Sequence, residues 1–156
     1  MMKMLKIVGA VVYVLLVCYV VFFARRREAM QETRRRELIN VVPVVNQLNT
    51  YNGLAPHDEK GKRNFVLNLV GNIVLFVPLP FFLFSFGVNR RKKIMLIALV
   101  ATGGIEATQL FFHIGVPDID DVLLNMTGAA LGILLLNLVP VTVRSAFAPS
   151  TPLITK

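Results

Sequence analysis

Residues 117–132 read PDIDDVLLNMTGAALG, and the predicted architecture of the chain is built around this segment. Asp118, Asp120 and Asp121 stand immediately before an apolar run. Acidic side chains are costly beside hydrocarbon, so three of them at a membrane edge indicate a functional pocket. The structural alternative is that Asp118 caps the following helix and that the helix dipole stabilises Asp121.

If this stretch is helical, Asp121, Asn125, Gly128 and Gly132 lie on one stripe, because they follow each other at intervals of three or four residues. The stripe combines a carboxylate, an amide and two positions without side chains. Two glycines at this spacing are also typical of a close-packing seam between membrane helices, and Asn125 is typical of an interhelical hydrogen bond. The stripe therefore needs partner helices, which the other apolar segments can supply.

The chain has 156 residues, 55% of them hydrophobic, and its apolar residues occur in long blocks. A membrane-spanning helix needs about 20 mostly apolar residues. Four blocks reach that length, at about Ile7–Ala24, Phe65–Val88, Ile94–Phe112 and Val122–Val139. The sequence predicts an all-α integral membrane protein with four transmembrane helices in one domain (residues 1–143), followed by a poorly ordered tail (residues 144–156).

The formal net charge of +8 comes from Lys and Arg that lie between the apolar blocks. In a soluble protein such clusters would indicate nucleic-acid binding. Beside membrane spans they are interpreted as headgroup contacts, so we expect membrane lipids as partners and no nucleic acid. Cys18 is the only cysteine and lies inside the first block, which excludes an internal disulfide and a thiolate metal cluster. The sequence identifies no cofactor and predicts no metal site.

The first apolar block follows Lys3 and Lys6, as in a signal peptide, but it is long for one and lacks a small-residue cleavage site. We interpret it as a retained anchor helix. Residues 25–63 form the only long connection, and the charge-paired helix formers in its first part could extend the first helix. The apolar residues around Pro43 are too few to span a bilayer, so we expect residues 38–53 to lie at the membrane interface.

The second block carries Asn68, Gly71 and Asn72 near its start and two prolines, Pro78 and Pro80, further along. Proline lacks a backbone donor, so we expect a kink near Pro78, with neighbouring helices satisfying the carbonyl groups that lose their donors. Gly71 and Pro78 are assigned to helix packing.

The third block carries its polar residues in its second half, where Thr102, Glu106, Gln109 and His113 lie on one helical face. Gln109 and His113 are also typical of wetted residues at a membrane edge. Glu106 lies about a third of the way into a bilayer, where a carboxylate needs a partner, a proton or a water-filled pocket.

The polar halves of the last three blocks meet on one side of the membrane, because consecutive spans run in opposite directions. At about 1.5 Å per residue, Asn72 and Glu106 lie roughly 10 Å inside the edge. We predict that the polar side chains converge in one pocket, against the alternative that the asparagines only join helices. The predicted pocket residues are Asn68, Asn72, Glu106, Gln109, Asp118, Asp120, Asp121 and Asn125.

Three motifs resemble the VanZ-like family, small bacterial membrane proteins named after a teicoplanin-resistance accessory protein. They are NxxxNIxLFxPL in the second block, IExxQ in the third and DIDDxLLNxxGAxxG in the fourth, and LINVVPVV is similar to the NLIPF segment of the family. The resemblance covers about residues 38–135. The matched positions are Asn40, Pro43, Asn68, Asn72, Phe76, Pro78, Glu106, Gln109, Asp118, Asp121, Asn125 and Gly128.

The resemblance implies a cell-envelope protein that influences how glycopeptide antibiotics act at the cell surface, and it supplies no biochemical mechanism. Two positions depart from the family pattern. The family usually has an arginine three residues before the first Asp of its DxDD motif, where this chain has Gly115, and its PLG is here Pro78-Leu79-Pro80. If that arginine binds an anionic group, its role is missing here or has passed to another base such as Arg63.

The distribution of basic residues does not orient the chain, because the segments on the N-terminal side hold eight Lys and Arg and residues 25–63 hold nine. We place both termini in the cytoplasm and the polar pocket outside, since the short Arg90–Lys93 hairpin favours retention inside. The resemblance to an envelope protein agrees. The predicted location is the bacterial cell membrane, crossed several times.

Three functions are compatible with this pattern. The pocket could bind a lipid-linked cell-wall precursor, a lipid headgroup or a glycopeptide without catalysis, and so alter sensitivity to teicoplanin-type antibiotics. Glu106, Asp118 and Asp121 are candidate catalytic residues of an intramembrane enzyme that uses paired carboxylates, or a cation held by them, on a lipid-linked substrate. Against an enzyme, the chain has no recognisable nucleophile elbow, HExxH motif or P-loop. The chain could also be part of an oligomeric transporter; the two spaced glycines are the only hint, and the oligomeric state stays open.

Overall fold

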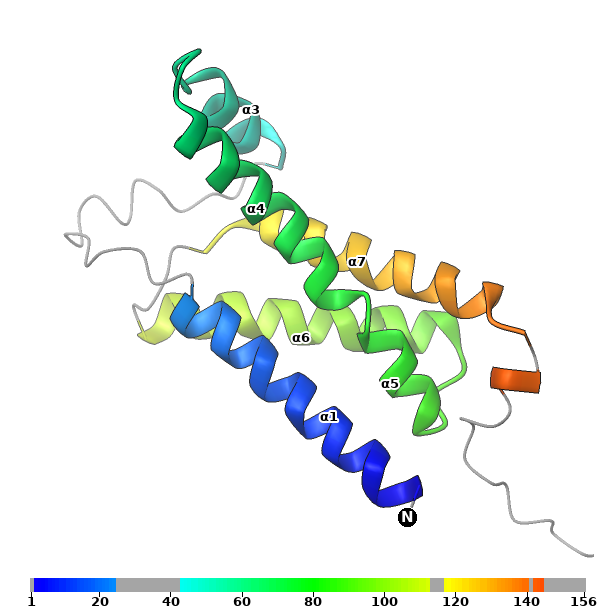
Figure 1. Cartoon of the computed structure of the whole chain (residues 1–156). Coiled ribbons are helices and arrows are strands. Elements are labelled where there is room, and N and C mark those ends of the chain that lie inside the picture. The colour runs from blue at the N-terminus through cyan, green and yellow to red at the C-terminus, as the bar shows by residue number, and fades with distance from the viewer. Residues whose placement is uncertain (1, 25–42, 113–116, 141, 145–156) are drawn as a thin grey trace, which may run out of the picture.

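The computed structural model describes residues 2–24, 43–112, 117–140 and 142–144, which are the residues considered below (Figure 1). All regular secondary structure in this part of the chain is helical, which confirms the predicted all-α class. The elements in chain order are α1 (Met2–Tyr19), the π-helical turn η1 (Val20–Ala24), α3 (Val45–Asn52), α4 (Glu59–Phe76), α5 (Leu79–Ser85), α6 (Arg91–Phe112) and α7 (Ile119–Leu138).

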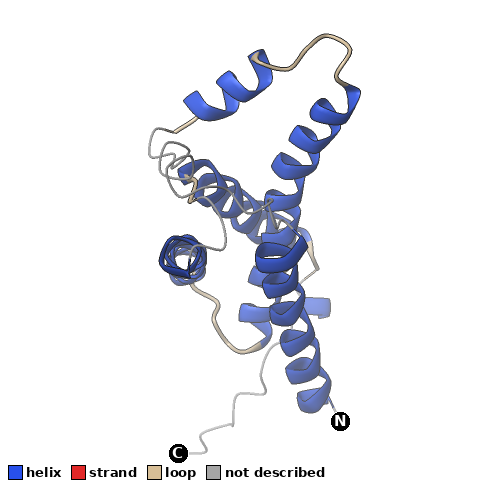
Figure 2. Ribbon diagram, turned by 90° about the vertical axis from the view of Figure 1, so that its left-hand side faces the viewer, coloured by secondary structure: helices blue, strands red, loops and turns tan. Residues whose placement is uncertain are grey.

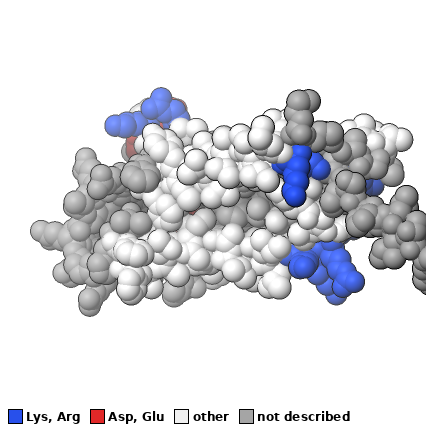
Figure 3. All heavy atoms as spheres, turned by 90° about the horizontal axis from the view of Figure 1, so that it is seen from below, with Lys and Arg blue, Asp and Glu red and all other residues white. Residues whose placement is uncertain are grey.

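Four helical stretches are long and apolar enough to cross a membrane, namely Lys3–Phe22, Glu59–Ser85, Arg91–Phe112 and Ile119–Leu138. The predicted bundle of four membrane helices is therefore confirmed. Large aliphatic side chains remain exposed along these helices, a surface that favours lipid over water. On the face shown in Figure 3, the visible Lys and Arg gather toward the two ends and leave an uncharged zone between them.

Helix α4 begins six residues before the predicted start of its span at Phe65. The carboxylate of Asp58 caps the helix by accepting a hydrogen bond of 2.8 Å from the backbone N–H of Gly61. The charged residues 59–63, which we had not included in the second apolar block, therefore form the first turns of α4. Helix α3 lies beside this extension, where the rings of Tyr51 and Phe65 are 5.6 Å apart, and both project beyond α6 and α7 (Figures 1 and 2).

The kink predicted near Pro78 is present, because the second span is divided into α4 and α5 at this point. Pro78 has no N–H to continue the α-helical pattern, and the N–H of Val77 instead donates to the Val74 carbonyl at 3.3 Å. Beyond the break, the Pro78 carbonyl accepts from the N–H groups of Phe81 and Phe82 and starts α5. The helices α4 and α5 therefore run in different directions but belong to the same span.

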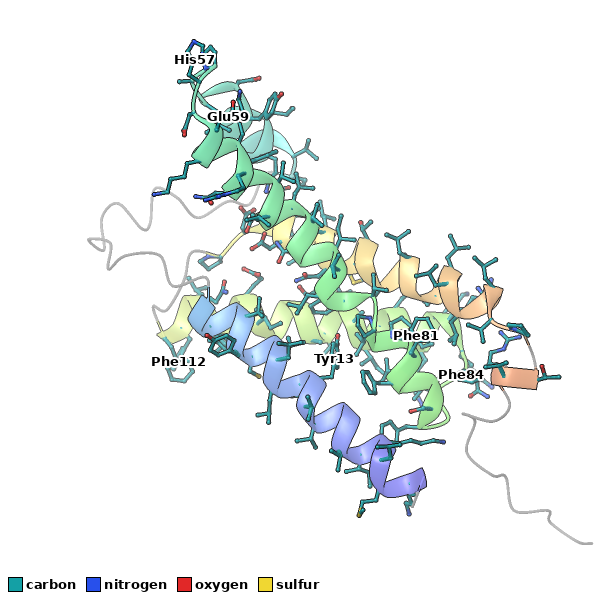
Figure 4. All side chains as sticks on the ribbon, viewed as in Figure 1. Tyr13, His57, Glu59, Phe81, Phe84 and Phe112 are labelled. Carbon is teal, nitrogen blue, oxygen red and sulfur yellow. The ribbon has the colours of Figure 1, made fainter. Side chains whose placement is uncertain are left out.

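Helix α1 is attached to this kink through Tyr13. The Tyr13 hydroxyl donates a hydrogen bond of 2.9 Å to the carbonyl of Leu75, next to Val74, whose carbonyl loses its donor to Pro78 and accepts instead from Val77. The ring of Tyr13, which Figure 4 labels, also stacks on Phe82, with ring centroids 5.0 Å apart, and Gly9 lies beside the same phenylalanine one turn earlier. Most of α1 is otherwise exposed, as expected of a lipid-facing anchor.

Helix α7 is the most buried of the four spans, and it packs against both α4 and α6. Its glycines make this possible. A Cβ atom at Gly128 would lie closer than 3.0 Å to the carbonyl of Ile73, and one at Gly132 closer than 3.0 Å to the carbonyl of Val77 and the ring of Pro80. The glycine seam is therefore covered by the kinked span of the same chain, and it no longer serves as a hint of oligomerisation.

Candidate functional site

Four hydrogen-bonded connections join separate elements at the polar end of the bundle, and the first is between α4 and the start of α7. Asn72 is almost fully buried, with 1% of its surface exposed, and its side-chain amide donates to Asp121 Oδ1 at 2.5 Å. A hydrogen bond to a carboxylate is among the stronger ones in proteins. The motif residues of the second and fourth spans are therefore direct partners.

The second connection joins α6 to the same end of α7. The Glu106 carboxylate accepts a hydrogen bond of 2.9 Å from the backbone N–H of Asp118, and the Asp118 carboxylate accepts one of 2.9 Å from the N–H of Asp120. Asp118 is the N-cap of α7, as the structural alternative proposed. Glu106 is half-buried beside it, so this carboxylate turns toward the bundle and away from lipid.

The third connection ties the segment before α3 to α7. Asp120 is only 3% exposed, and its Oδ1 accepts a hydrogen bond of 2.6 Å from the backbone N–H of Val44. Val44 has φ +68°, which is unusual for a β-branched residue. The sequence placed Asp120 among the pocket residues and gave no sign of this anchor, because its partner is a backbone group 76 residues away.

The fourth connection lies deeper in the bundle, between α6 and α7. The Asn125 amide donates to the Thr102 hydroxyl at 2.8 Å, and both residues are buried. Asn125 Oδ1 is also buried and has no hydrogen-bond partner in the described part of the chain. We had placed Thr102 on the polar face of its helix but not in the pocket, and its burial together with this hydrogen bond adds it to the cluster.

The other predicted residues fall around these connections. Gln109 is 8% exposed on α6, and Asn68 and Gly71 are half-buried on α4, with Asn68 one turn before Asn72. Asn40, His113 and Gly115 lie outside the described residues, as do the predicted extension of the first helix and residues 145–156 of the predicted tail. We call the set Thr102, Glu106, Asp118, Asp120, Asp121, Asn72 and Asn125 the polar cluster.

The polar cluster is rich in hydrogen-bond acceptors, because four of its members are carboxylic acids. Asp121, Asp120 and Glu106 each accept from a donor on another element, so the acids tie α4, the segment before α3 and α6 to α7. Within the described residues, no group of three or more His, Cys, Asp or Glu side chains is arranged to hold a metal ion. The chemistry that suits such a cluster is the binding of hydroxyl and ammonium groups.

Four apolar helices with an acid-and-amide cluster at one end define the chain as a membrane protein with a polar site built between its spans. The model of the VanZ/LLP1 family matches residues 10–140, and the chain belongs to that family. The match confirms the predicted family and extends beyond the motifs to include most of the first helix. No curated protein and no solved structure matches the chain.

Proposed function

We propose that this protein crosses the bacterial cell membrane several times and that its polar cluster binds the headgroup of a lipid-linked cell-wall precursor without catalysis. By holding that headgroup it would alter sensitivity to teicoplanin-type glycopeptides, in keeping with the envelope role that membership of the VanZ/LLP1 family fits. The observation that carries the proposal is the pairing of acids and amides from α4, α6 and α7 at one end of the bundle.

The acceptor-rich chemistry of the cluster supports this class of ligand. The sugar hydroxyls and peptide amines of a cell-wall precursor are hydrogen-bond donors, which complement carboxylate and amide oxygens. The buried Asn125 Oδ1 is an acceptor for which the described residues provide no donor, and a bound headgroup or a water molecule could supply it. A site without these polar groups would bind only the lipid tail of the precursor and not its headgroup.

A binding role fits the cluster better than proton transfer. Asp120 and Asp121 accept hydrogen bonds from Val44 and Asn72, and these bonds connect separate elements of the bundle. Glu106 is likewise engaged by the N-cap of α7. The acids therefore act as hydrogen-bond acceptors that fix the geometry of the cluster, which is what a binding site requires.

The proposal is tested by susceptibility in a sensitive Gram-positive host. Expression of the wild type is expected to change the inhibitory concentration of teicoplanin several-fold, and Glu106→Gln and Asp121→Asn are expected to abolish that change. Gly104→Ala is the matched control on α6, because a Cβ atom at this position meets nothing within 4 Å. All variants are compared at equal amounts in the membrane, since a destabilised bundle would also lose the effect.

Equal susceptibility of wild type, Glu106→Gln and Asp121→Asn would disprove this function. Turnover of a purified precursor by the wild type, lost in Glu106→Gln, would instead support the enzyme. The proposed orientation, with both termini in the cytoplasm and the polar cluster outside, is tested by reporters placed after Lys93 and after Gly115. A cytoplasmic signal after Gly115 would reverse it.

A further inference from the structure

The bundle contains a second candidate site, a pocket of about 430 Å³ at the end opposite the polar cluster. The start of α1, helix α5, the end of α7 and residues 143–144 line it. Its volume lies within the range of about 300–1,000 Å³ that is typical of small-molecule sites. Residues on its walls include Leu5, Lys6, Phe81, Phe84, Leu136 and Arg144.

The walls of this pocket are amphipathic. Phe81 and Phe84 extend from α5 on the side of the bundle where the chain leaves α7, and Leu136 adds an aliphatic wall (Figure 4). Lys6 on α1 and Arg144 after α7 line the same pocket, and both side chains are half-buried. An apolar chamber bounded by two cations favours a ligand with a hydrocarbon part and an anionic part.

The distribution of charged residues along the sequence also favours an anionic ligand in this pocket. All nine Asp and Glu residues lie between Glu28 and Asp121, and none occurs in residues 1–27, 60–105 or 122–156. The segments around the pocket therefore contribute only basic side chains, whereas residues 25–63 mix both signs. Figure 3 shows Lys and Arg gathered toward one end of the molecule with no Asp or Glu visible beside them.

We propose that this pocket is a binding site for an anionic phospholipid, separate from the polar cluster. One acyl chain lies between the aromatic wall of α5 and the end of α7, and the headgroup phosphate lies between Lys6 and Arg144. The N–H groups of arginine and lysine are the usual donors to phosphate oxygens in proteins. Because α1 contacts the rest of the bundle mainly near Tyr13, a lipid here would also join its first turns to α5 and α7.

Occupancy can be measured directly, because the sequence contains no tryptophan. A Val143→Trp variant places a single fluorophore on the wall of the pocket, and Val100→Trp places one on the exposed, lipid-facing side of α6. In phosphatidylcholine vesicles that contain a few per cent of brominated lipid, we expect brominated phosphatidylglycerol to quench the Val143→Trp fluorescence more strongly than brominated phosphatidylcholine. Both lipids are expected to quench the Val100→Trp fluorescence equally.

The charge requirement is tested in the Val143→Trp background. Replacing Lys6 and Arg144 together by Gln is expected to weaken the apparent affinity for phosphatidylglycerol about thirtyfold, since each replacement removes a hydrogen bond to the phosphate that contributes a factor of about five. Replacing Lys92 and Lys93 by Gln removes the same charge at the same end of the bundle without touching the pocket, and it should leave the preference in place.

Three results would overturn the proposal. Equal quenching of the Val143→Trp fluorescence by the two lipids would show that the pocket does not select an anion. An equal loss of preference in both charge variants would show general surface attraction and no built site. Displacement of the brominated lipid by excess inorganic phosphate would show that the acyl chain contributes nothing. None of these measurements depends on glycopeptide susceptibility, so this site and the polar cluster are tested independently.

Discussion

Asn72 on α4 donates a hydrogen bond of 2.5 Å to Asp121 on α7, and this single contact joins two sequence motifs that are 49 residues apart. Asn72 is buried, so its amide has no access to solvent. The contact lies at the same end of α7 as the N-cap Asp118 and the carboxylate of Glu106. The start of α7 is therefore fixed from two sides, by an amide of α4 and by an acid of α6.

The first prediction concerns this pair. Asn72→Leu removes the donor and leaves the Asp121 carboxylate without it, so we expect a loss of about 1–3 kcal/mol in the free energy of unfolding. The double variant Asn72→Leu, Asp121→Leu should lose less than the sum of the two single variants, because both polar partners are then absent. Thermal unfolding in detergent measures all three, and strictly additive losses would show that the two side chains do not interact.

The second prediction uses the glycines. Gly128→Ala should destabilise the bundle by about 1–3 kcal/mol, because the new methyl group would collide with the Ile73 carbonyl, which cannot move without shifting α4. Gly104→Ala should be neutral or stabilising by up to about 1 kcal/mol, since its methyl group meets nothing and alanine favours the helix. Midpoints of thermal unfolding compare the two, and equal midpoints would contradict the assignment of Gly128 to close packing.

Length and composition were sufficient to predict the four spans, because a bilayer requires long apolar helices whatever their partners are. The kink was predictable from Pro78, since a missing N–H interrupts the helix in any environment. The stripe of Asp121, Asn125, Gly128 and Gly132 followed from helical periodicity. These features depend on local sequence and on the solvent, and both were available before the structure.

The sequence did not predict the hydrogen-bond partner of each acidic side chain. The Asp120 carboxylate accepts from the backbone of Val44, which carries no side-chain signal, and the φ of +68° at Val44 depends on how the chain enters α3. The early start of α4 was missed because the charged residues after Asp58 are polar enough to be taken for a loop. The pocket beside Phe84 was also missed, since its walls come from three separated segments.

The third prediction concerns the anchor between Val44 and α7. Asp120→Leu removes the acceptor, so the backbone N–H of Val44 should exchange with deuterium faster, while that of Gly61, which Asp58 holds, should not change. Val44→Gly retains the hydrogen bond and removes the steric cost of a positive φ, and it should stabilise the protein by about 1 kcal/mol. Hydrogen exchange with mass spectrometry checks both, and an unchanged Val44 exchange rate in Asp120→Leu would contradict the anchor.

The fourth prediction concerns the attachment of α1. Tyr13→Phe removes the hydrogen bond to the Leu75 carbonyl but keeps the ring that stacks on Phe82, so we expect a loss of about 0.5–1.5 kcal/mol. Tyr13→Leu removes both contacts and should cost more, since stacked aromatic pairs add about 0.5–1.5 kcal/mol of their own. The distribution of distances between spin labels on α1 and α5 should be broader in Tyr13→Phe than in the wild type, and broader still in Tyr13→Leu. Equal stability of Tyr13→Phe and the wild type would show that the kink carbonyl does not need the α1 hydroxyl, and that ring stacking alone holds the first helix.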